Sequence, residues 1–269
     1  MMYRQHFGLT QEPLGKNVKS LWDDGQLQDL TSSFNCLLAH PGLGLLTGEP
    51  GVGKTAALHS IVNTLNPHKY LIVYLSETDF GRLDIYRQLA IAMGIEPAYR
   101  RSNLWRDIKL YIEELVLHKN VLPIIIIDEA HNLPKEFYRD LPSFMNFAFD
   151  SKDMMVIWLV GHLSLAHMMS RNIHAAVSSR ISAKHIWLPI QENDRFTAMV
   201  TYALKEAGIQ SQIISDSGMN MLCMASLGNP RIANKLLVTA MQIAAGKGMN
   251  HLPDDILKLS IAALQNKLP

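Results

Sequence analysis

The chain has 269 residues, of which 48% are hydrophobic and 18% are charged, and its formal net charge at pH 7 is +1. This length and composition suit one large domain, or a core domain with a smaller appendage, that buries a sizeable core. The small net charge excludes a chain that is basic throughout, so nucleic acid would have to bind a local patch. Two cysteines far apart in the sequence, Cys36 and Cys223, indicate reduced thiols.

The N-terminal residues lack the apolar run of a signal peptide. The longest apolar stretches, such as residues 121–127, are much shorter than the roughly twenty residues that a membrane-spanning helix needs. We therefore expect a soluble, cytoplasmic protein without a membrane segment.

Short apolar runs alternate with helical patterns over the first two thirds of the chain. Continuous apolar runs of this kind are typical of strands that are covered on both faces. The pattern predicts strands at residues 43–47, 70–75, 121–127, 154–160 and 184–188. Between them lie amphipathic helices, such as residues 103–118, whose apolar positions form one stripe. This alternation predicts an α/β fold with a five-stranded, mostly parallel sheet between helices.

The strand pattern stops near Pro189, and the rest of the chain reads as helices. Glycines and prolines separate these segments, which we expect at residues 192–207, 215–226, 230–245 and 253–266. The sequence thus predicts two domains, a nucleotide-binding α/β domain over residues 1–190 and a small helical lid over residues 191–269.

Residues 48–55 fit the Gly-x-x-x-x-Gly-Lys-Thr phosphate loop at every specified position. A chance glycine-rich turn is the alternative, but an apolar strand precedes the loop and a helix follows it, as the motif requires. Lys54 would reach the β- and γ-phosphates, and Thr55 would offer its hydroxyl to Mg²⁺. The residues that we expect around the phosphates are Gly48, Glu49, Pro50, Gly51, Val52, Gly53, Lys54, Thr55 and Ala56.

Two carboxylates, Asp128 and Glu129, follow the four isoleucines of residues 124–127. Ligands of open α/β sheets bind beyond the carboxyl ends of the strands. This position suits Asp128 as a Mg²⁺ ligand through a water, and Glu129 as the base that deprotonates the attacking water. Two solvated acids at an ordinary strand end are the alternative. A phosphate loop upstream favours the catalytic interpretation, with ATP and Mg²⁺ as cofactors.

Several motifs together resemble those of AAA+ ATPases, and within that class they resemble the ExeA-type group. The resemblance covers nearly the whole chain. The matching segments are residues 7–9 with Glu12 and Pro13, residues 46–55, residues 127–131, residues 159–162, and Gly228-Asn229-Pro230-Arg231.

The resemblance implies roles for residues outside the two main motifs. His162 would be the polar sensor of the γ-phosphate or the attacking water, although relatives often carry Asn, Thr or Gln there, and a hydrogen-bonded turn histidine is the other interpretation. Arg231 would be the second sensor, which contacts the nucleotide from the lid. Phe7, Leu9, Pro13 and Ile190 could pack against adenine, or they could be plain core.

Arg180 is where the resemblance implies an arginine finger that enters a neighbouring subunit's site, and Arg171 is the alternative. The planar guanidinium can spread its charge over the γ-phosphate oxygens. If either assignment is right, hydrolysis requires a homo-oligomer, either a ring or a helical filament.

The motifs do not identify the molecule on which this ATPase acts, its client, so we consider three functions. The first is a DNA transposition helper, similar to TniB, TnsC and MuB, that oligomerises on duplex DNA and recruits a transposase, with a target-selection protein as a further partner. Arg82, Arg87, Arg100 and Arg101 would contact DNA phosphates, unless they form a solvated helix face.

The second function is a secretion-assembly ATPase that acts on a protein client. Secretion members of the ExeA-like group add a membrane span and a cell-wall-binding domain, and this sequence shows neither, so we expect the transposition function first. The third function is a signalling or defence switch, which would need fused sensor and effector domains.

Overall fold

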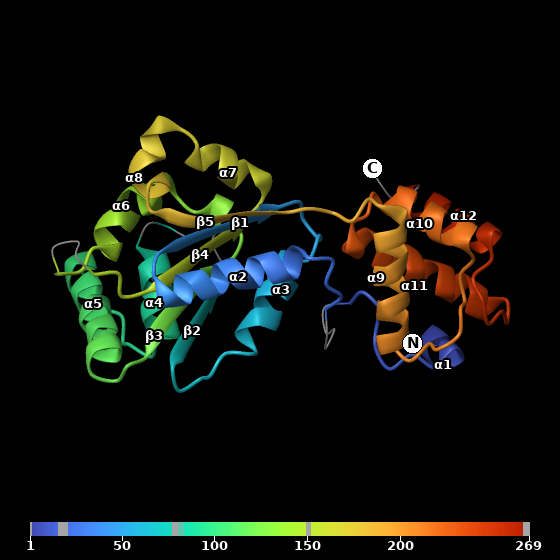
Figure 1. The fold of residues 1–269 in the computed structure, drawn as a ribbon, viewed down its shortest axis with the longest axis horizontal. Helices are drawn as coiled ribbons and strands as arrows, with labels where there is room; N and C mark the ends of the chain where they lie inside the picture. Colours follow the sequence, from blue (N-terminus) through green and yellow to red (C-terminus); the bar gives the residue numbers. More distant parts are fainter. Residues whose placement is uncertain (1, 16–20, 77–80, 82, 149–151, 266–269) are drawn as a thin grey trace. The chain divides into compact units, whose positions relative to one another are not determined.

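The computed structural model describes residues 2–15, 21–76, 81, 83–148 and 152–265 (Figure 1). The chain divides into two compact units. The sheet unit comprises Gln26–Glu49 and Ala57–Trp187, and the helical unit comprises Met1–Gly25, Pro50–Ala56 and Leu188–Pro269.

A five-stranded parallel sheet forms the centre of the sheet unit, as the sequence predicts. Its spatial order is β2-β3-β4-β1-β5. The strands are β1 (Leu43–Gly48), β2 (Tyr70–Leu75), β3 (Leu122–Ile127), β4 (Val156–Gly161) and β5 (Ile181–Trp187). β5 begins at Ile181, earlier than the predicted 184, because Ile181 already pairs with Leu43 before a shift in register. β5 is an edge strand whose exposed residues alternate with buried or partly buried ones, so its sequence has no continuous apolar run.

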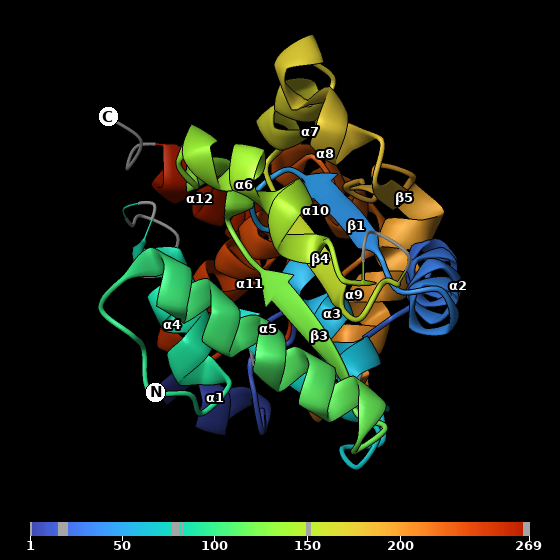
Figure 2. The same cartoon turned by 90° about the vertical axis from the view of Figure 1, so that its left-hand side faces the viewer.

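Helices cover both faces of the sheet. They are α2 (Gln26–Ala39), α3 (Lys54–Val62), α4 (Asp84–Ala92), α5 (Arg101–Leu117), α6 (Lys135–Met145), α7 (Leu163–Met169) and α8 (Ala175–Ser178), with short 3₁₀ turns η1 (Ala130–Asn132) and η3 (Asn172–His174). On one face, buried residues of α4 to α7 pack with alternate strand residues such as Ile125 and Ile157. Figure 2 shows α5 lying across β3, with α4 beside it.

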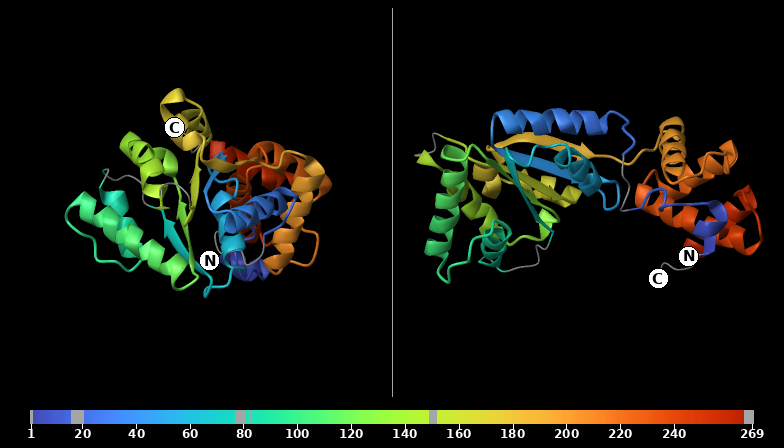
Figure 3. Two further views of the ribbon diagram at one scale, coloured as in Figure 1. Left: turned by 60° about the vertical axis from the view of Figure 1, so that its left-hand side comes forward. Right: turned by 90° about the horizontal axis from the view of Figure 1, so that it is seen from below.

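The opposite face packs against α2, which runs along β1 and β5 (Figure 3). The rings of Phe34 on α2 and Trp158 on β4 stack with centroids 5.5 Å apart. Gly44 on β1 makes room for this stack, because a Cβ there would lie 2.6 Å from the indole of Trp158. The large ring therefore explains a glycine in the middle of a buried strand.

The helical unit contains α1 (Met2–Phe7), α9 (Asn193–Glu206), α10 (Asp216–Ser226), α11 (Pro230–Gly246) and α12 (Asp254–Gln265). The residues that these helices bury form a core separate from that of the sheet unit. These helices begin close to the residues that the sequence predicts, because capping residues mark their first turns. The hydroxyl of Ser215 accepts from Gly218 N–H and caps α10, and Asn229 caps α11 with Pro230 in the first turn.

The predicted division places the N-terminal residues with the α/β domain, and the structure groups them differently. The described residues of Met1–Gly25 lie in the helical unit, where Tyr3 and Leu9 are buried in its core. The backbone N–H of Thr10 donates to the carbonyl of Ala207 at 2.9 Å, and that of Leu14 donates to Oδ1 of Asn234 at 3.3 Å. Burial of these apolar side chains against α9 to α12 explains the different grouping.

None of the helices in the described part of the chain combines the length and apolar character that a bilayer-spanning segment requires.

Candidate nucleotide site

The phosphate loop connects the carboxyl end of β1 to the start of α3 at Lys54. Gly51 and Gly53 have φ values of +87° and +113°, in the region that only glycine adopts without strain. Gly48 is also required, because a Cβ there would lie 2.3 Å from the carbonyl oxygen of Trp187 on β5. The glycines of the motif thus allow a tight turn whose backbone amides can surround an anion.

Within the loop, the exposure of the side chains differs. Val52 and Lys54 are buried, whereas Glu49, Pro50, Thr55 and Ala56 are exposed. The start of α3 at Lys54 adds the positive end of a helix dipole to the loop, as an anion site needs.

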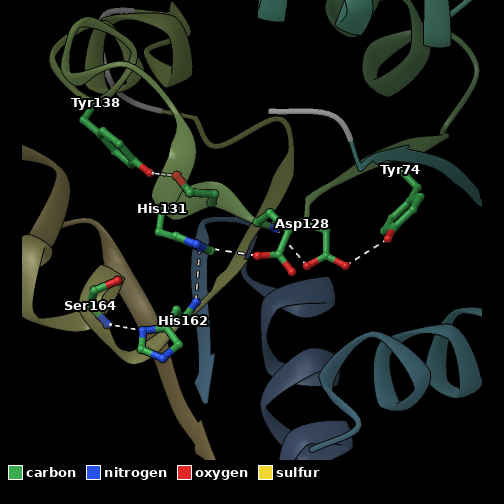
Figure 4. A network of polar contacts seen from close by, with 8 residues as sticks. Tyr74, Asp128, His131, Tyr138, His162 and Ser164 are labelled. Carbon is green, nitrogen blue, oxygen red and sulfur yellow. Dashed lines mark hydrogen bonds and ion pairs between the residues drawn. The ribbon is translucent and has the colours of Figure 1, made fainter. Parts of the chain in front are cut away.

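The carboxylate of Asp128 lies at the carboxyl end of β3, and both of its oxygens accept hydrogen bonds. Tyr74 on β2 donates its hydroxyl to Oδ2 at 2.9 Å, and the backbone N–H of Glu129 donates to Oδ1 at 2.9 Å (Figure 4). The backbone N–H of Asp128 continues the ladder by donating to the carbonyl of Leu75 at 2.8 Å. The residue is only 6% exposed, so its carboxylate has a defined orientation.

The hydroxyl of Tyr74 remains a donor at neutral pH. Partial burial, and next the neighbouring charge of Asp128, raise the pKa of Tyr74 well above its usual value. Both effects disfavour the phenolate, because it would be partly desolvated and would lie beside a carboxylate.

Glu129 turns away from the strand with a left-handed backbone, at φ 50° and ψ 33°. This conformation is uncommon for a residue other than glycine and is concentrated at functional sites. Its side chain is 57% exposed, and Oε2 lies 3.6 Å from Nδ1 of His131. The exposed carboxylate can reach a water, as a general base must.

His131 lies between Glu129 and the end of β4. Its Nδ1 accepts the backbone N–H of His162 at 3.3 Å, so the same nitrogen faces both a donor and the carboxylate of Glu129 (Figure 4). A nitrogen that accepts this bond carries no proton and cannot donate to Glu129 at the same time. Gly161 permits the close approach, because a Cβ there would lie 3.2 Å from Nδ1 of His131.

His162 caps α7. Its Nδ1 accepts the backbone N–H of Ser164 at 3.3 Å, and its ring lies 6.1 Å from that of His131. This geometry matches the turn interpretation and places the residue beside His131, which lies near Glu129. The sensor role stays a prediction.

Arg231 lies in the first turn of α11, in the helical unit, and its side chain is exposed. Its backbone N–H donates to Oδ1 of Asn229 at 3.0 Å and to the carbonyl of Gly51 at 3.3 Å. The backbone of Arg231 is therefore hydrogen-bonded to the phosphate loop, and its role as the second sensor stays a prediction.

The two candidate finger arginines lie between α7 and β5. Arg180 donates from Nη1 to the carbonyl of Ala176 on α8 at 3.1 Å, and Arg171 is exposed before η3. The choice between them stays a prediction.

The four arginines expected at DNA differ in their surroundings. Arg82 lies outside the described residues. Arg87 pairs with Asp84 at 3.2 Å, and Arg100 is exposed before α5. Arg101 pairs with the buried Asp140 at 2.8 Å and lies over the ring of Trp105 at 4.3 Å. Arg101 therefore has a structural role that competes with phosphate binding.

Among the residues suggested for adenine, Leu9 and Pro13 are buried, whereas Phe7 and Ile190 are partly buried against the helical core. Leu9 contributes to that core, which supports the plain-core interpretation for this residue.

The residues present fit the two cofactors. Left-handed glycines and a helix start suit a phosphate group, and an oriented carboxylate suits Mg²⁺, which prefers oxygen ligands.

Sequence reasoning did not predict the contacts of Tyr74, His131 and Asn229 in this arrangement. These contacts join segments far apart in the sequence, so no local pattern indicates them.

Comparisons with known proteins agree with this architecture. Residues 38–169 match the sequence model of the family described as AAA domain. General secretion pathway protein A of Aeromonas hydrophila is 25% identical over 256 residues, which cover 93% of this chain and 46% of the relative. The chain thus spans less than half the length of this curated relative.

Among solved structures, Cdc6p from Pyrobaculum aerophilum matches with a TM-score of 0.70 and 17% identity, over 99% of this chain and 74% of that one. Drosophila ORC bound to DNA matches with a TM-score of 0.70 and 15% identity, over 98% and 66%. At these identities the likeness concerns the fold alone. With its five-stranded parallel sheet, its phosphate loop after β1 and its helical C-terminal part, the chain has the AAA+ P-loop fold.

Proposed function

We propose that this chain is a Mg²⁺-dependent ATPase of the ExeA-like AAA+ type whose nucleotide state controls its assembly on a client. The observation that carries the proposal is the common edge of the sheet. β1, β3 and β4 are parallel and end at the same edge, where β1 leads into the phosphate loop and β3 ends in the acidic pair. Phosphoryl transfer needs little besides such positioning and charge.

The proposed roles follow the chemistry of each side chain. Lys54 binds the β- and γ-phosphates as a point charge, and the hydroxyl of Thr55 and the carboxylate of Asp128 hold the metal. When bound, Mg²⁺ neutralises negative charge on the phosphates. Glu129 accepts a proton from the water that attacks the γ-phosphorus, and the ADP oxygen leaves with the electrons of the broken bond.

Residues beyond the loop and the acidic pair would respond to the nucleotide. Arg231 contacts it from α11, and His162 contacts the γ-phosphate or the attacking water. Arg180, or Arg171 in its place, completes the site of a neighbouring subunit, so the proposal includes a homo-oligomer.

The test of this core proposal measures uptake and hydrolysis separately. We expect calorimetry to show ATP uptake in the presence of Mg²⁺, and phosphate release that depends on protein concentration. Lys54→Ala is expected to lose both, because the phosphates lose their charged partner. Absence of ATP uptake by the unmodified protein would contradict the proposal.

For the client, we propose duplex DNA and a transposase, as in transposition helpers. One protein with the same fold is described as bound to DNA, which supports a DNA client. Arg87 and Arg100 supply positive charge around α4 and α5 for contacts to phosphates. Cytoplasmic location and a target-selection partner belong to the same proposal.

A protein client in secretion-complex assembly is the second candidate. The similarity to general secretion pathway protein A over 93% of the chain favours it. Binding to random duplex DNA with ATP, with ADP and without nucleotide separates the two. A transposition helper is expected to bind in the presence of ATP with affinity that falls steeply with salt, whereas a secretion ATPase shows no such binding.

A further inference from the structure

Asn229 joins the start of α11 to the phosphate loop within the helical unit. Its Oδ1 accepts the backbone N–H groups of Arg231 at 3.0 Å and Ile232 at 3.4 Å, which caps the helix. Its Nδ2 donates to the carbonyl of Pro50 at 2.9 Å. One end of the amide faces two donors and the other faces an acceptor, so its orientation is unambiguous. The residue is only 5% exposed.

Gly51 allows this contact, and Gly228, directly before Asn229, allows a close approach to Ile190. A Cβ on Gly51 would lie 2.7 Å from Cβ of Arg231 and 2.9 Å from Oδ1 of Asn229. A Cβ on Gly228 would lie 2.2 Å from the carbonyl oxygen of Ile190, and Gly228 accepts the backbone N–H of that residue at 3.1 Å. We call Pro50, Gly51, Gly228, Asn229 and Arg231 the Asn229 junction.

The Asn229 junction holds two carbonyl groups of the phosphate loop by hydrogen bonds. The carbonyls of Pro50 and Gly51 each accept a hydrogen bond from the start of α11. An anion-binding loop must present backbone N–H groups to the ligand, and fixing the carbonyls of the same peptides restricts the rotation of those peptides. The first backbone N–H groups of α11 donate to Asn229 and Gly51, so they stabilise the contact between the helix and the loop.

We propose that Asn229 is a positioning residue that preorganises the phosphate loop and couples it to α11. The proposal rests on the function proposed above. Because coupling is reciprocal, a nucleotide that orders the loop also stabilises the first turn of α11, and loss of the junction weakens nucleotide binding.

Substitution of Asn229 separates capping from the contact to Pro50. Serine is as good an N-cap as asparagine, but its hydroxyl is too short to keep both contacts. Asn229→Ser should therefore preserve the helix start and release the carbonyl of Pro50, whereas Asn229→Ala removes both functions. Asn234→Ser is the matched control, because Asn234 lies on the same helix and contacts Leu14 and Glu12 instead.

Hydrogen exchange on the full chain without nucleotide is the first measurement. We expect Asn229→Ser to increase exchange at residues 51–56 while the first turn of α11 keeps its protection. Asn229→Ala should increase exchange in both segments, and Asn234→Ser should leave residues 51–56 unchanged.

ADP binding by calorimetry is the second measurement. We expect Asn229→Ser to weaken ADP roughly three- to tenfold, as the loss of one hydrogen bond predicts, and to lose the ADP-induced protection of α11. Unchanged exchange at residues 51–56 in Asn229→Ser, or an equal loss of affinity in Asn234→Ser, overturns the inference. If the unmodified protein takes up no ADP, the proposed function fails, and the exchange experiment still decides the junction.

Discussion

The hydroxyl of Tyr74 lies 2.9 Å from Oδ2 of Asp128, across the boundary between edge strand β2 and β3. Tyr74 pairs in register with Ile126, so its side chain reaches diagonally to the residue two positions further along the neighbouring chain segment. The bond holds the carboxylate in one orientation, in the manner of residues that position metal ligands.

Replacing Tyr74 by Phe should raise the Mg²⁺ requirement for nucleotide binding about tenfold, because the carboxylate loses its orienting donor. The measurement is ADP affinity at increasing Mg²⁺ concentration, with an EDTA sample as the reference. Affinity without Mg²⁺ should not change. Tyr70→Phe is the control, since it removes a hydroxyl from the start of the same strand. Equal Mg²⁺ titrations of Tyr74→Phe and the unmodified protein would rule out this role.

Replacing Glu129 by Gln should preserve ATP binding and lower the rate of hydrolysis about 100-fold or more, because the amide cannot accept the proton of water. ATP affinity and single-turnover phosphate release measure the two effects. The exposed position of Glu129 makes a folding defect unexpected, and thermal unfolding checks this. A normal rate of hydrolysis in Glu129→Gln would show that another group activates the water.

Replacing Arg180 by Ala should leave ATP binding unchanged and lower turnover about 1000-fold, as expected for a finger that acts on a neighbour's nucleotide. Mixing Arg180→Ala with Glu129→Gln subunits should restore activity, because interfaces form in which one subunit supplies the arginine and the other the glutamate. Arg171→Ala is the comparison. Restoration only with Arg171→Ala would transfer the role to that residue.

The stability of the sheet unit should fall in mild acid. Nε2 of His185 on β5 lies 2.7 Å from Oγ of Ser33 on α2, and burial lowers the pKa of His185 below its usual value. The unfolded chain therefore binds this proton first, and the stabilisation is lost as the pH falls from about 6.5 through the lower folded pKa.

Urea unfolding at pH 7.5 and pH 5.5 measures this effect. His185→Gln should unfold with a smaller difference between the two pH values, whereas His167→Gln, which changes an exposed histidine, should keep the full difference. An unchanged pH dependence in His185→Gln contradicts the assignment.

Local sequence determined the parallel sheet and the position of the phosphate loop. Four consecutive isoleucines before Asp128 are typical of a strand covered on both faces, and the loop motif specifies its own backbone. These features depend on residues close together in the sequence, so the periodicity of apolar residues and the spacing of motif residues predict them. The helix start at Asn229 and Pro230 was predictable for the same reason.

Tertiary structure alone decided which distant residues surround these motifs. The hydroxyl of Tyr74 reaches Asp128 because β2 and β3 pair in a particular register, and Asn229 reaches Pro50 because α11 packs on the loop. The N-terminal residues join the helical unit because their apolar side chains are buried there. These contacts join residues far apart in the sequence and depend on packing, which spacing along the chain does not encode.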